Sequence, residues 1–129
     1  MVAGMSSAIL QGVPASTLDT DLWIGLPERQ YIRLINLSLS LGAELVRSTV
    51  VALRDGSLVN YLYRVDGLAS FATEWRRAAT VKLHGFEVKV VPLERIIRSK
   101  EFLRRPKDVA HLPLLRDIVA SRKVSGIKK

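Results

Sequence analysis

Two short turns that contain glycine constrain the fold of this chain more than any other feature of the sequence. The first is Asp55-Gly56 and the second is His84-Gly85, and each stands between two apolar runs. Such a pair between apolar runs is typical of a β-hairpin, because glycine adopts the positive backbone angles of a tight turn without steric cost. The strands that these turns predict are residues 49–53, 58–64, 81–83 and 86–90.

Apolar residues outside the hairpins recur at the spacing of a helix, as Tyr31 and Ile35 or Phe71 and Trp75 do. The predicted helices are residues 6–11, 27–41, 70–79, 92–103 and 107–122, with further strands at 1–3 and 18–26. This alternation predicts a single α/β (α+β) domain over residues 1–124, in which helices pack on a mixed β-sheet. We expect residues 125–129 to form a basic, flexible tail.

The composition excludes several classes of protein. The chain has 129 residues, of which 48% are hydrophobic, so it suits one domain with a real core rather than a disordered chain. It contains no cysteine, which excludes disulfide scaffolds, thiolate metal sites and cysteine nucleophiles. No apolar run approaches the ~20 residues of a membrane span, and residues 1–10 lack the basic start of a signal peptide. We therefore expect a cytoplasmic protein with no membrane partner.

The net charge of +8 is confined to one half of the chain. Residues 1–64 hold five arginines and five acidic residues, so this half has no net charge. The other fifteen basic residues share residues 65–129 with seven acidic ones. Such asymmetry favours an anionic partner, for example a nucleotide phosphate or a nucleic acid. The alternative is a basic surface that contacts only solvent.

Asp19 and Asp21 are the strongest chemical signal in the sequence. They are two residues apart near the start of a predicted strand, so their side chains point to the same face. Two adjacent carboxylates repel each other unless a positive group lies between them, and Mg²⁺ suits that position. The alternative is a pair of exposed acids at the entrance of a strand, with Asp19 capping a turn.

Gly4 adds a second signal, because it precedes a short predicted helix. A glycine at such a place lets a phosphate approach the backbone N–H groups of the helix. The alternative is a plain turn between a strand and a helix. Together with Asp19 and Asp21, Gly4 favours a site for an anion and a cation.

Two ordered motifs resemble those of a known superfamily. The first comprises Gly4-Met5-Ser6-Ser7-Ala8, Gly12 and Thr17-x-Asp19-x-Asp21-Leu22. The second comprises Pro92-Leu93-Glu94-Arg95-Ile96-Ile97-Arg98-Ser99-Lys100 and Arg105-Pro106-Lys107-Asp108. From Val2 to about Leu115, the chain resembles the minimal nucleotidyltransferase superfamily, which has the polymerase-β-type catalytic fold. Within it, the chain is similar to bacterial nucleotidyltransferase-like proteins related to abortive-infection toxins.

The resemblance implies a reaction and a role for each motif residue. The reaction is transfer of a nucleoside monophosphate from a nucleoside triphosphate (NTP) to a hydroxyl acceptor, with release of pyrophosphate. Asp19 and Asp21 would hold two Mg²⁺ ions, and Gly4 and Ser6 would lie under the phosphates. Lys100 would pair with phosphate charge, and Lys107-Asp108 would lie at the edge of the site. The implied partners are an NTP, an RNA or protein acceptor and an antitoxin or other partner protein.

The chain departs from the superfamily pattern at several positions. Met5 replaces a second glycine and crowds the expected place of the phosphates, and Gln11 replaces a histidine. The third catalytic carboxylate falls on Asn60, which offers a neutral oxygen to a metal but cannot accept a proton at neutral pH. Asp66 is a poor substitute, because it lies beside the break at Gly67. A helix usually precedes the first strand in this superfamily, whereas this chain starts inside that strand.

Three functions stay open from the sequence. The first is NTP-dependent transfer, weakened or lost because the third carboxylate is Asn60. The second is a degenerate member of the fold that binds a nucleotide or a partner without turnover. The third is a small basic nucleic-acid-binding domain that uses no metal.

The basic residues of the helix over 92–103 and its exit have two interpretations. They form either a positive wall that faces Asp19 and Asp21, or a solvated face held by the pairs Glu94–Arg98 and Glu101–Arg105. We expect Trp23 and Trp75 in the core, and we assign no catalytic role to His84 or His111. The basic residues concerned are Arg95, Arg98, Lys100, Arg104, Arg105 and Lys107.

Overall fold

One mixed β-sheet runs through the molecule. The computed structural model describes residues 1–127, and the strands in this range are β1 (Val2–Ala3), β2 (Asp19–Trp23), β3 (Glu44–Arg47), β4 (Val50–Ala52), β5 (Leu58–Leu62), β6 (Ala79–Leu83) and β7 (Phe86–Val90). Their order in the sheet is β3-β4-β5-β2-β1-β7-β6. The β1–β7 and β2–β5 pairs are parallel and the other pairs are antiparallel, so the predicted mixed sheet is confirmed.

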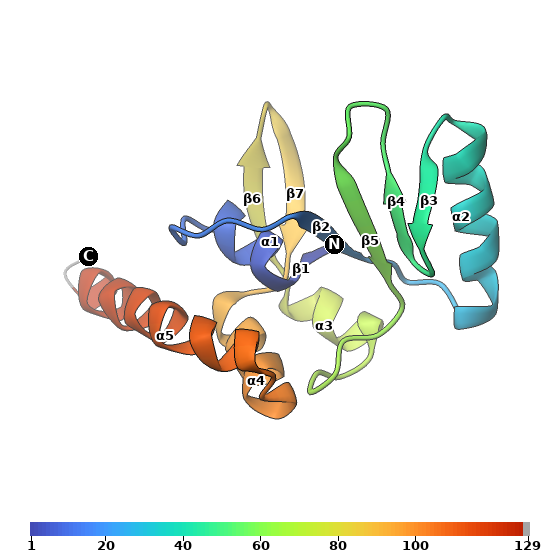
Figure 1. Cartoon of the computed structure of the whole chain (residues 1–129). Coiled ribbons are helices and arrows are strands. Elements are labelled where there is room, and N and C mark those ends of the chain that lie inside the picture. The colour runs from blue at the N-terminus through green and yellow to red at the C-terminus, as the bar shows by residue number, and fades with distance from the viewer. Residues whose placement is uncertain (128–129) are drawn as a thin grey trace.

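Helices surround this sheet and complete a single α+β domain, as predicted. Within residues 1–127 they are α1 (Gly4–Leu10), α2 (Tyr31–Ser40), α3 (Phe71–Arg77), α4 (Leu93–Leu103) and α5 (Pro106–Ile127). Figure 1 shows α2 beside the β3 edge of the sheet, α3 and α4 near the lower ends of the strands, and α5 extending away from them. None of the helices in the described range combines the length and the apolar character that a membrane crossing requires.

Both predicted hairpins are present, as β4–β5 and β6–β7. The sequence missed β3, because all four residues of this edge strand are exposed and no buried face marks it. α2 begins at Tyr31 rather than at Pro27, since a 3₁₀ turn occupies Glu28–Gln30. α5 continues to Ile127, so the predicted tail is helical as far as that residue. The rest of the tail, residues 128–129, lies outside the described residues.

The main hydrophobic core joins the sheet to α1, α4 and α5. Trp23 of β2, Ala8 of α1, Ile96 of α4 and Leu115 of α5 are buried together in it. Complete burial of one large apolar side chain contributes about 2 kcal/mol to the free energy of unfolding. A second cluster, which joins α2 to β4 and β5, comprises Ile35, Val51 and Val59.

The two tryptophans, both expected in the core, differ in burial. Trp23 is 1% exposed, so the prediction is confirmed for this residue. The prediction is wrong for Trp75, which is 44% exposed because it lies on the outer side of α3. Its ring stacks on Phe71 at 5.7 Å between centroids, and Phe71 in turn meets Trp23 edge-on. Trp75 therefore packs on the outer side of Phe71, which itself contacts the buried Trp23.

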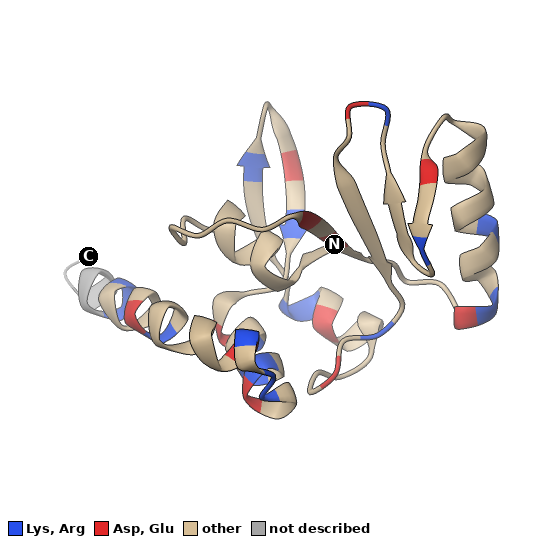
Figure 2. Ribbon diagram, in the orientation of Figure 1, with Lys and Arg blue, Asp and Glu red and all other residues tan. Residues whose placement is uncertain are grey.

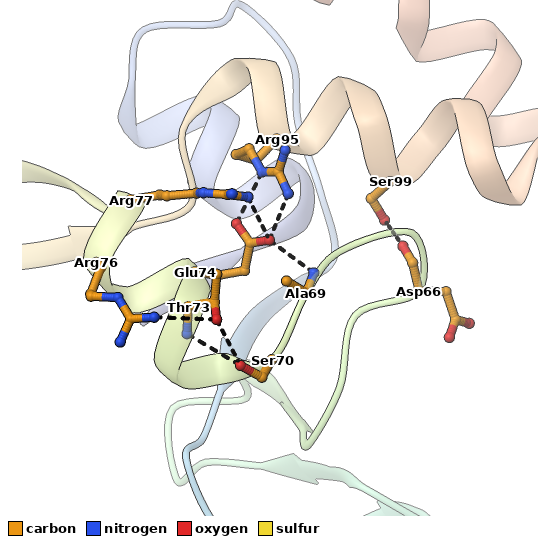
Figure 3. A network of polar contacts seen from close by, with 9 residues as sticks. All are labelled: Asp66, Ala69, Ser70, Thr73, Glu74, Arg76, Arg77, Arg95 and Ser99. Atoms are coloured by element: carbon orange, nitrogen blue, oxygen red, sulfur yellow. Dashed lines mark hydrogen bonds and ion pairs between the residues drawn. The ribbon is translucent and has the colours of Figure 1, made fainter.

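A buried carboxylate joins α3 to α4. The Glu74 side chain is 1% exposed and accepts two hydrogen bonds from the Arg95 guanidinium, at 2.9 and 2.7 Å. The backbone N–H of Ala69 donates a third at 2.9 Å, and Arg77 adds an ion pair at 3.6 Å (Figure 3). Burial alone would raise the pKa of Glu74, but the bonds from Arg95 and Ala69 outweigh it and hold the pKa below its usual value. This pair fixes the first turn of α4.

We predict that Glu74→Gln lowers the free energy of unfolding by about 1–3 kcal/mol at neutral pH, because it removes the charge that the Arg95 hydrogen bonds require. The folded-state pKa of Glu74 is depressed, so its contribution is present above the usual glutamate pKa and is lost as pH falls through the folded-state value. Urea denaturation at several pH values should therefore show that the free energies of unfolding of the wild type and of Glu74→Gln become equal in acid. The exposed Glu87 provides the control, and equal losses for Glu87→Gln and Glu74→Gln would contradict the prediction.

Candidate functional site

Strands β2 and β5 bring three of the predicted site residues together. Asp19 and Asp21 are two positions apart on β2, so both side chains lie on the same face. The parallel register pairs Asp21 with Asn60 of β5, and Asn60 Nδ2 donates a hydrogen bond to Asp21 Oδ1 at 3.2 Å. Thr49 donates through Oγ1 to Asn60 Oδ1 at 2.8 Å, which orients the amide. Asn60 thus lies beside Asp21, at the position where the resemblance implies a third carboxylate.

Gly4 lies against Asp21 where β1 passes into α1. Its φ is +58°, and a Cβ at this position would be 2.4 Å from Asp21 Oδ2. Both the backbone angle and the lack of space therefore require glycine here. The next residue, Met5, is buried in the main core.

Ser6 holds β2 in place through its hydroxyl. The Ser6 Oγ donates to the backbone carbonyl of Asp19 at 3.1 Å and accepts from the backbone N–H of Asp21 at 2.9 Å. These bonds fix α1 against the strand that carries both carboxylates. A cleft lies between β2 and α4, and Ser6 is not among the described residues that line it. The structure therefore does not bring Ser6 to the predicted phosphate site.

A cleft of about 370 Å³ lies between β2, β5 and the junction of α4 with α5, and we call it the central cleft. Lys100 of α4 lines it together with Arg105 and Lys107, and Figure 2 shows Lys and Arg gathered on the ribbon where these two helices meet. Positive and negative side chains therefore face one shared space. The predicted site residues that line it are Gly4, Asp19, Asp21, Asn60, Lys100 and Lys107.

The two carboxylates of the central cleft differ in their surroundings. Burial raises the pKa of Asp21, the negative charge of Asp19 raises it further, and the hydrogen bond from Asn60 opposes both. Asp19 instead forms an ion pair with Arg47 of β3, at 3.5 Å between Nη2 and Oδ2. The Arg47 side chain is 63% exposed, so this pair is weak. Asp21 is therefore the carboxylate that gains most from a bound cation.

Asp108 anchors the cations of the central cleft. Its buried carboxylate accepts from Lys100 Nζ at 3.2 Å and from Arg105 through Nε at 2.7 Å, Nη2 at 3.2 Å and the backbone N–H at 3.2 Å. Asp108 is the third residue of α5, so the backbone bond also caps that helix. Burial alone would raise the pKa of Asp108, but the bonds from Arg105 and Lys100 outweigh it and lower the pKa.

The pair Glu101–Arg105, which the alternative of a solvated helix face required, does not form. Arg105 is bonded to Asp108, and Glu101 forms an ion pair with Arg116 of α5 at 2.7 Å. The physical reason is that α4 ends at Leu103, where Arg104 adopts a left-handed conformation, so Arg105 is no longer on the helix. The positive wall is thus the arrangement that the structure adopts for Lys100, Arg105 and Lys107.

Four charged or titratable residues that line the central cleft were given no role from the sequence: Arg47, Arg64, Asp66 and His111. Arg47 could not be placed, because β3 was not predicted. Asp66 was dismissed as a ligand, yet it lines the cleft and its backbone carbonyl accepts a bond from Ser99 Oγ at 2.7 Å (Figure 3). His111 had one signal, since it is three residues after Asp108 on a predicted helix and therefore shares its face.

Comparison of the chain with protein-family models and with curated proteins finds no match. Among the described residues, no group of three or more His, Cys, Asp or Glu side chains is placed to hold a metal ion. Asp19 and Asp21 thus act as a pair of carboxylates, with the neutral amide of Asn60 beside them.

We predict that Gly4→Ala lowers the free energy of unfolding more than Gly56→Ala does. Both glycines have positive φ, at +58° and +87°, so each substitution has the steric cost of a left-handed alanine, about 1–2 kcal/mol. Only the Cβ at position 4 would also displace Asp21, because no atom lies within 4 Å of a Cβ at position 56. Urea denaturation of both variants measures the difference. Equal losses would show that Gly4 does not restrain Asp21.

Proposed function

We propose that the protein binds a nucleoside triphosphate together with Mg²⁺ in the central cleft, and that it is a nucleotidyltransferase of the kind its two sequence motifs resemble. One observation carries the proposal: Asp19 and Asp21 share a single cleft with Lys100, Arg105 and Lys107. Carboxylate oxygens bind Mg²⁺, and clustered cations attract phosphate. The arrangement supports a ligand in which a divalent cation and several phosphates occur together.

The side chains of the cleft fit Mg²⁺. This ion is commonly held by one or two carboxylates and completes its octahedral shell with water and substrate phosphates. Asp19 and Asp21 would supply the carboxylates, and the cleft volume of about 370 Å³ lies within the range of small-molecule sites. When bound, Mg²⁺ neutralises triphosphate charge and favours departure of pyrophosphate.

In the proposed reaction, the oxygen of an acceptor hydroxyl attacks the α-phosphorus. A P–O ester bond forms, the bond from the α-phosphorus to the α,β-bridging oxygen breaks, and pyrophosphate leaves. Lys100, Arg105 and Lys107 would neutralise the charge that develops on the phosphates. Asn60 cannot take the hydroxyl proton, which therefore passes to solvent, and we expect slow transfer. The acceptor class, RNA or protein, and the partner protein stay predictions.

A second candidate is nucleotide binding without turnover. It is favoured by the Asn60 amide, which donates an N–H to Asp21 and turns its oxygen towards Thr49. In this orientation Asn60 is not a metal ligand, so the cleft presents two charged ligands rather than three. Detection of NTP-dependent labelling of an acceptor separates the first candidate from the second.

The first test is a thermal-shift titration with ATP, GTP, CTP and UTP, with and without Mg²⁺. At a hundred times its dissociation constant, a ligand stabilises the folded state by about 2.7 kcal/mol, which a shift in Tm reports. We expect a Mg²⁺-dependent shift with at least one NTP, and its loss in the double variant Asp19→Asn/Asp21→Asn.

The control for that titration is Asp117→Asn, an exposed acid of α5 that is not among the described lining residues of the cleft. It should keep the full shift. A wild-type protein without any Mg²⁺-dependent shift would refute the proposal. If the double variant then bound a single-stranded oligonucleotide as well as the wild type does, the basic nucleic-acid-binding function would replace it.

The second test is Asn60→Asp. A third carboxylate beside Asp21 repels it, so we expect a lower Tm without Mg²⁺ and recovery of the loss when Mg²⁺ is added. Affinity for Mn²⁺, used as a paramagnetic substitute, should increase about tenfold. Asn36→Asp, at an exposed position of α2, should change neither quantity. Unchanged Mn²⁺ affinity in Asn60→Asp would place the cation away from Asp21.

A further inference from the structure

The buried ammonium of Lys100 has partners on two sides. Lys100 is 7% exposed, and its Nζ is 3.2 Å from Asp108 Oδ1 and 3.3 Å from His111 Nδ1. An ammonium has three N–H groups, and these two partners account for two of them. Among the described residues, no third hydrogen-bond partner of Nζ is present, although Lys100 lines the central cleft. The third N–H is therefore available to a ligand in that cleft.

Asp108 alone does not determine the direction of that ammonium. Its carboxylate also accepts from three N–H donors of Arg105. Asp108 therefore makes a single hydrogen bond with Lys100, through Oδ1. A single contact leaves the flexible four-carbon side chain of Lys100 free to swing its ammonium about that contact. A second acceptor at a fixed angle removes that freedom, and His111 is placed to be this acceptor.

His111 can accept only when Nδ1 carries no proton. Burial lowers the pKa of His111, and the positive charge of Lys100 lowers it further. The charged groups that face it are Lys100 from α4 and Asp108 and Lys107 from α5, of which Asp108 alone opposes the shift. The imidazole is thus neutral at physiological pH, with its proton on Nε2 and the lone pair of Nδ1 directed to Lys100.

We infer that His111 is a positioning residue, whose neutral Nδ1 and the carboxylate of Asp108 together direct the third N–H of Lys100 into the central cleft, towards a phosphate oxygen of the bound ligand. The inference rests on the proposed function, because it takes the NTP as that ligand. In this role His111 acts through Lys100. It restricts the orientation of Lys100 before the ligand binds, so less conformational entropy is lost on binding.

Two amide variants separate this role from a merely structural one. In His111→Asn, the side-chain carbonyl can occupy the place of Nδ1, so an acceptor for Lys100 is kept. In His111→Gln, the amide reaches the place of Nε2 instead, and Lys100 loses its acceptor. Both variants are polar and uncharged, so differences in burial and solubility between them are small.

Affinity for Mg²⁺-ATP is measured by isothermal titration calorimetry. We expect His111→Gln to weaken binding about tenfold, as loss of one hydrogen bond to a charged group would, and His111→Asn to stay within about threefold of the wild type. Between about pH 8 and pH 5.5, wild-type affinity should fall more steeply than that of His111→Asn, since protonated His111 cannot accept from Lys100. Titration of the nucleotide phosphates is common to both proteins and cancels in the comparison.

A second readout needs no nucleotide. In the free protein, the Nζ–H signal of Lys100 in a ¹⁵N NMR spectrum should be visible in the wild type and in His111→Asn, because a held and buried ammonium exchanges slowly with water. It should broaden or disappear in His111→Gln. An unchanged signal there, or equal affinities of the two variants for Mg²⁺-ATP, would overturn the role of His111 even if the wild type binds the nucleotide. If the Lys100 signal differs between the wild type and His111→Gln as expected but the wild type binds no NTP, the proposed function and the choice of ligand would be overturned instead.

Discussion

The pairing of β2 with both β1 and β5 is the interaction on which the rest of the structure depends. The antiparallel pairing with β1 places Ala3 opposite Asp21, which brings Gly4 against the Asp21 carboxylate. The parallel pairing with β5 places Asn60 opposite the same residue. A slip of one residue on β2 would turn Asp19 and Asp21 to the other face of the sheet. The central cleft would then keep its cations and lose its acidic wall.

The cationic wall depends in turn on two buried carboxylates that hold α4 at its two ends. Glu74 of α3 binds Arg95 in the first turn of α4, and Asp108 of α5 binds Lys100 in its last turn. Removing one partner of such a pair leaves an uncompensated buried charge, which costs far more than an exposed ion pair contributes. Because both ends of α4 are held in this way, Lys100 has a defined position relative to Asp21. These two buried acids therefore determine the geometry of the cations in the cleft.

The sequence predicted those features that depend on local periodicity. Glycine turns located both hairpins, and the alternation of side chains along a strand placed Asp19 and Asp21 on one face, while Asn60 was singled out by the resemblance to the superfamily. It did not predict contacts that depend on where an element stops. Helical i, i+4 spacing offered Glu101 as a partner for Arg105, whereas the left-handed Arg104 follows the last residue of α4 and Arg105 bonds to Asp108. Arg47 lies on an exposed edge strand, whose residues carry no pattern of burial for sequence analysis to detect.

Two of the residues that depart from the pattern the chain resembles, Gln11 and Asn60, have hydrogen-bond partners within this fold. Gln11 Nε2 donates to the backbone carbonyl of Val91 at 2.8 Å, so the amide ties α1 to the segment after β7. Asn60 donates to Asp21 where a third carboxylate would repel it, and Arg47 offsets the charge of Asp19.

Arg47 thus offsets the charge of Asp19, whereas the hydrogen bond from Asn60 does not outweigh the burial that raises the pKa of Asp21. A cation that enters the cleft must compete with the exposed guanidinium of Arg47 for Asp19, whereas Asp21 is hydrogen-bonded by a neutral amide and feels the charges of Lys107 and Lys100 without an ion pair to either. Because an exposed ion pair contributes little free energy, that competition is weak. The limit on cation affinity is therefore the number of negative charges in the cleft, which Asn60 reduces by one relative to the superfamily pattern.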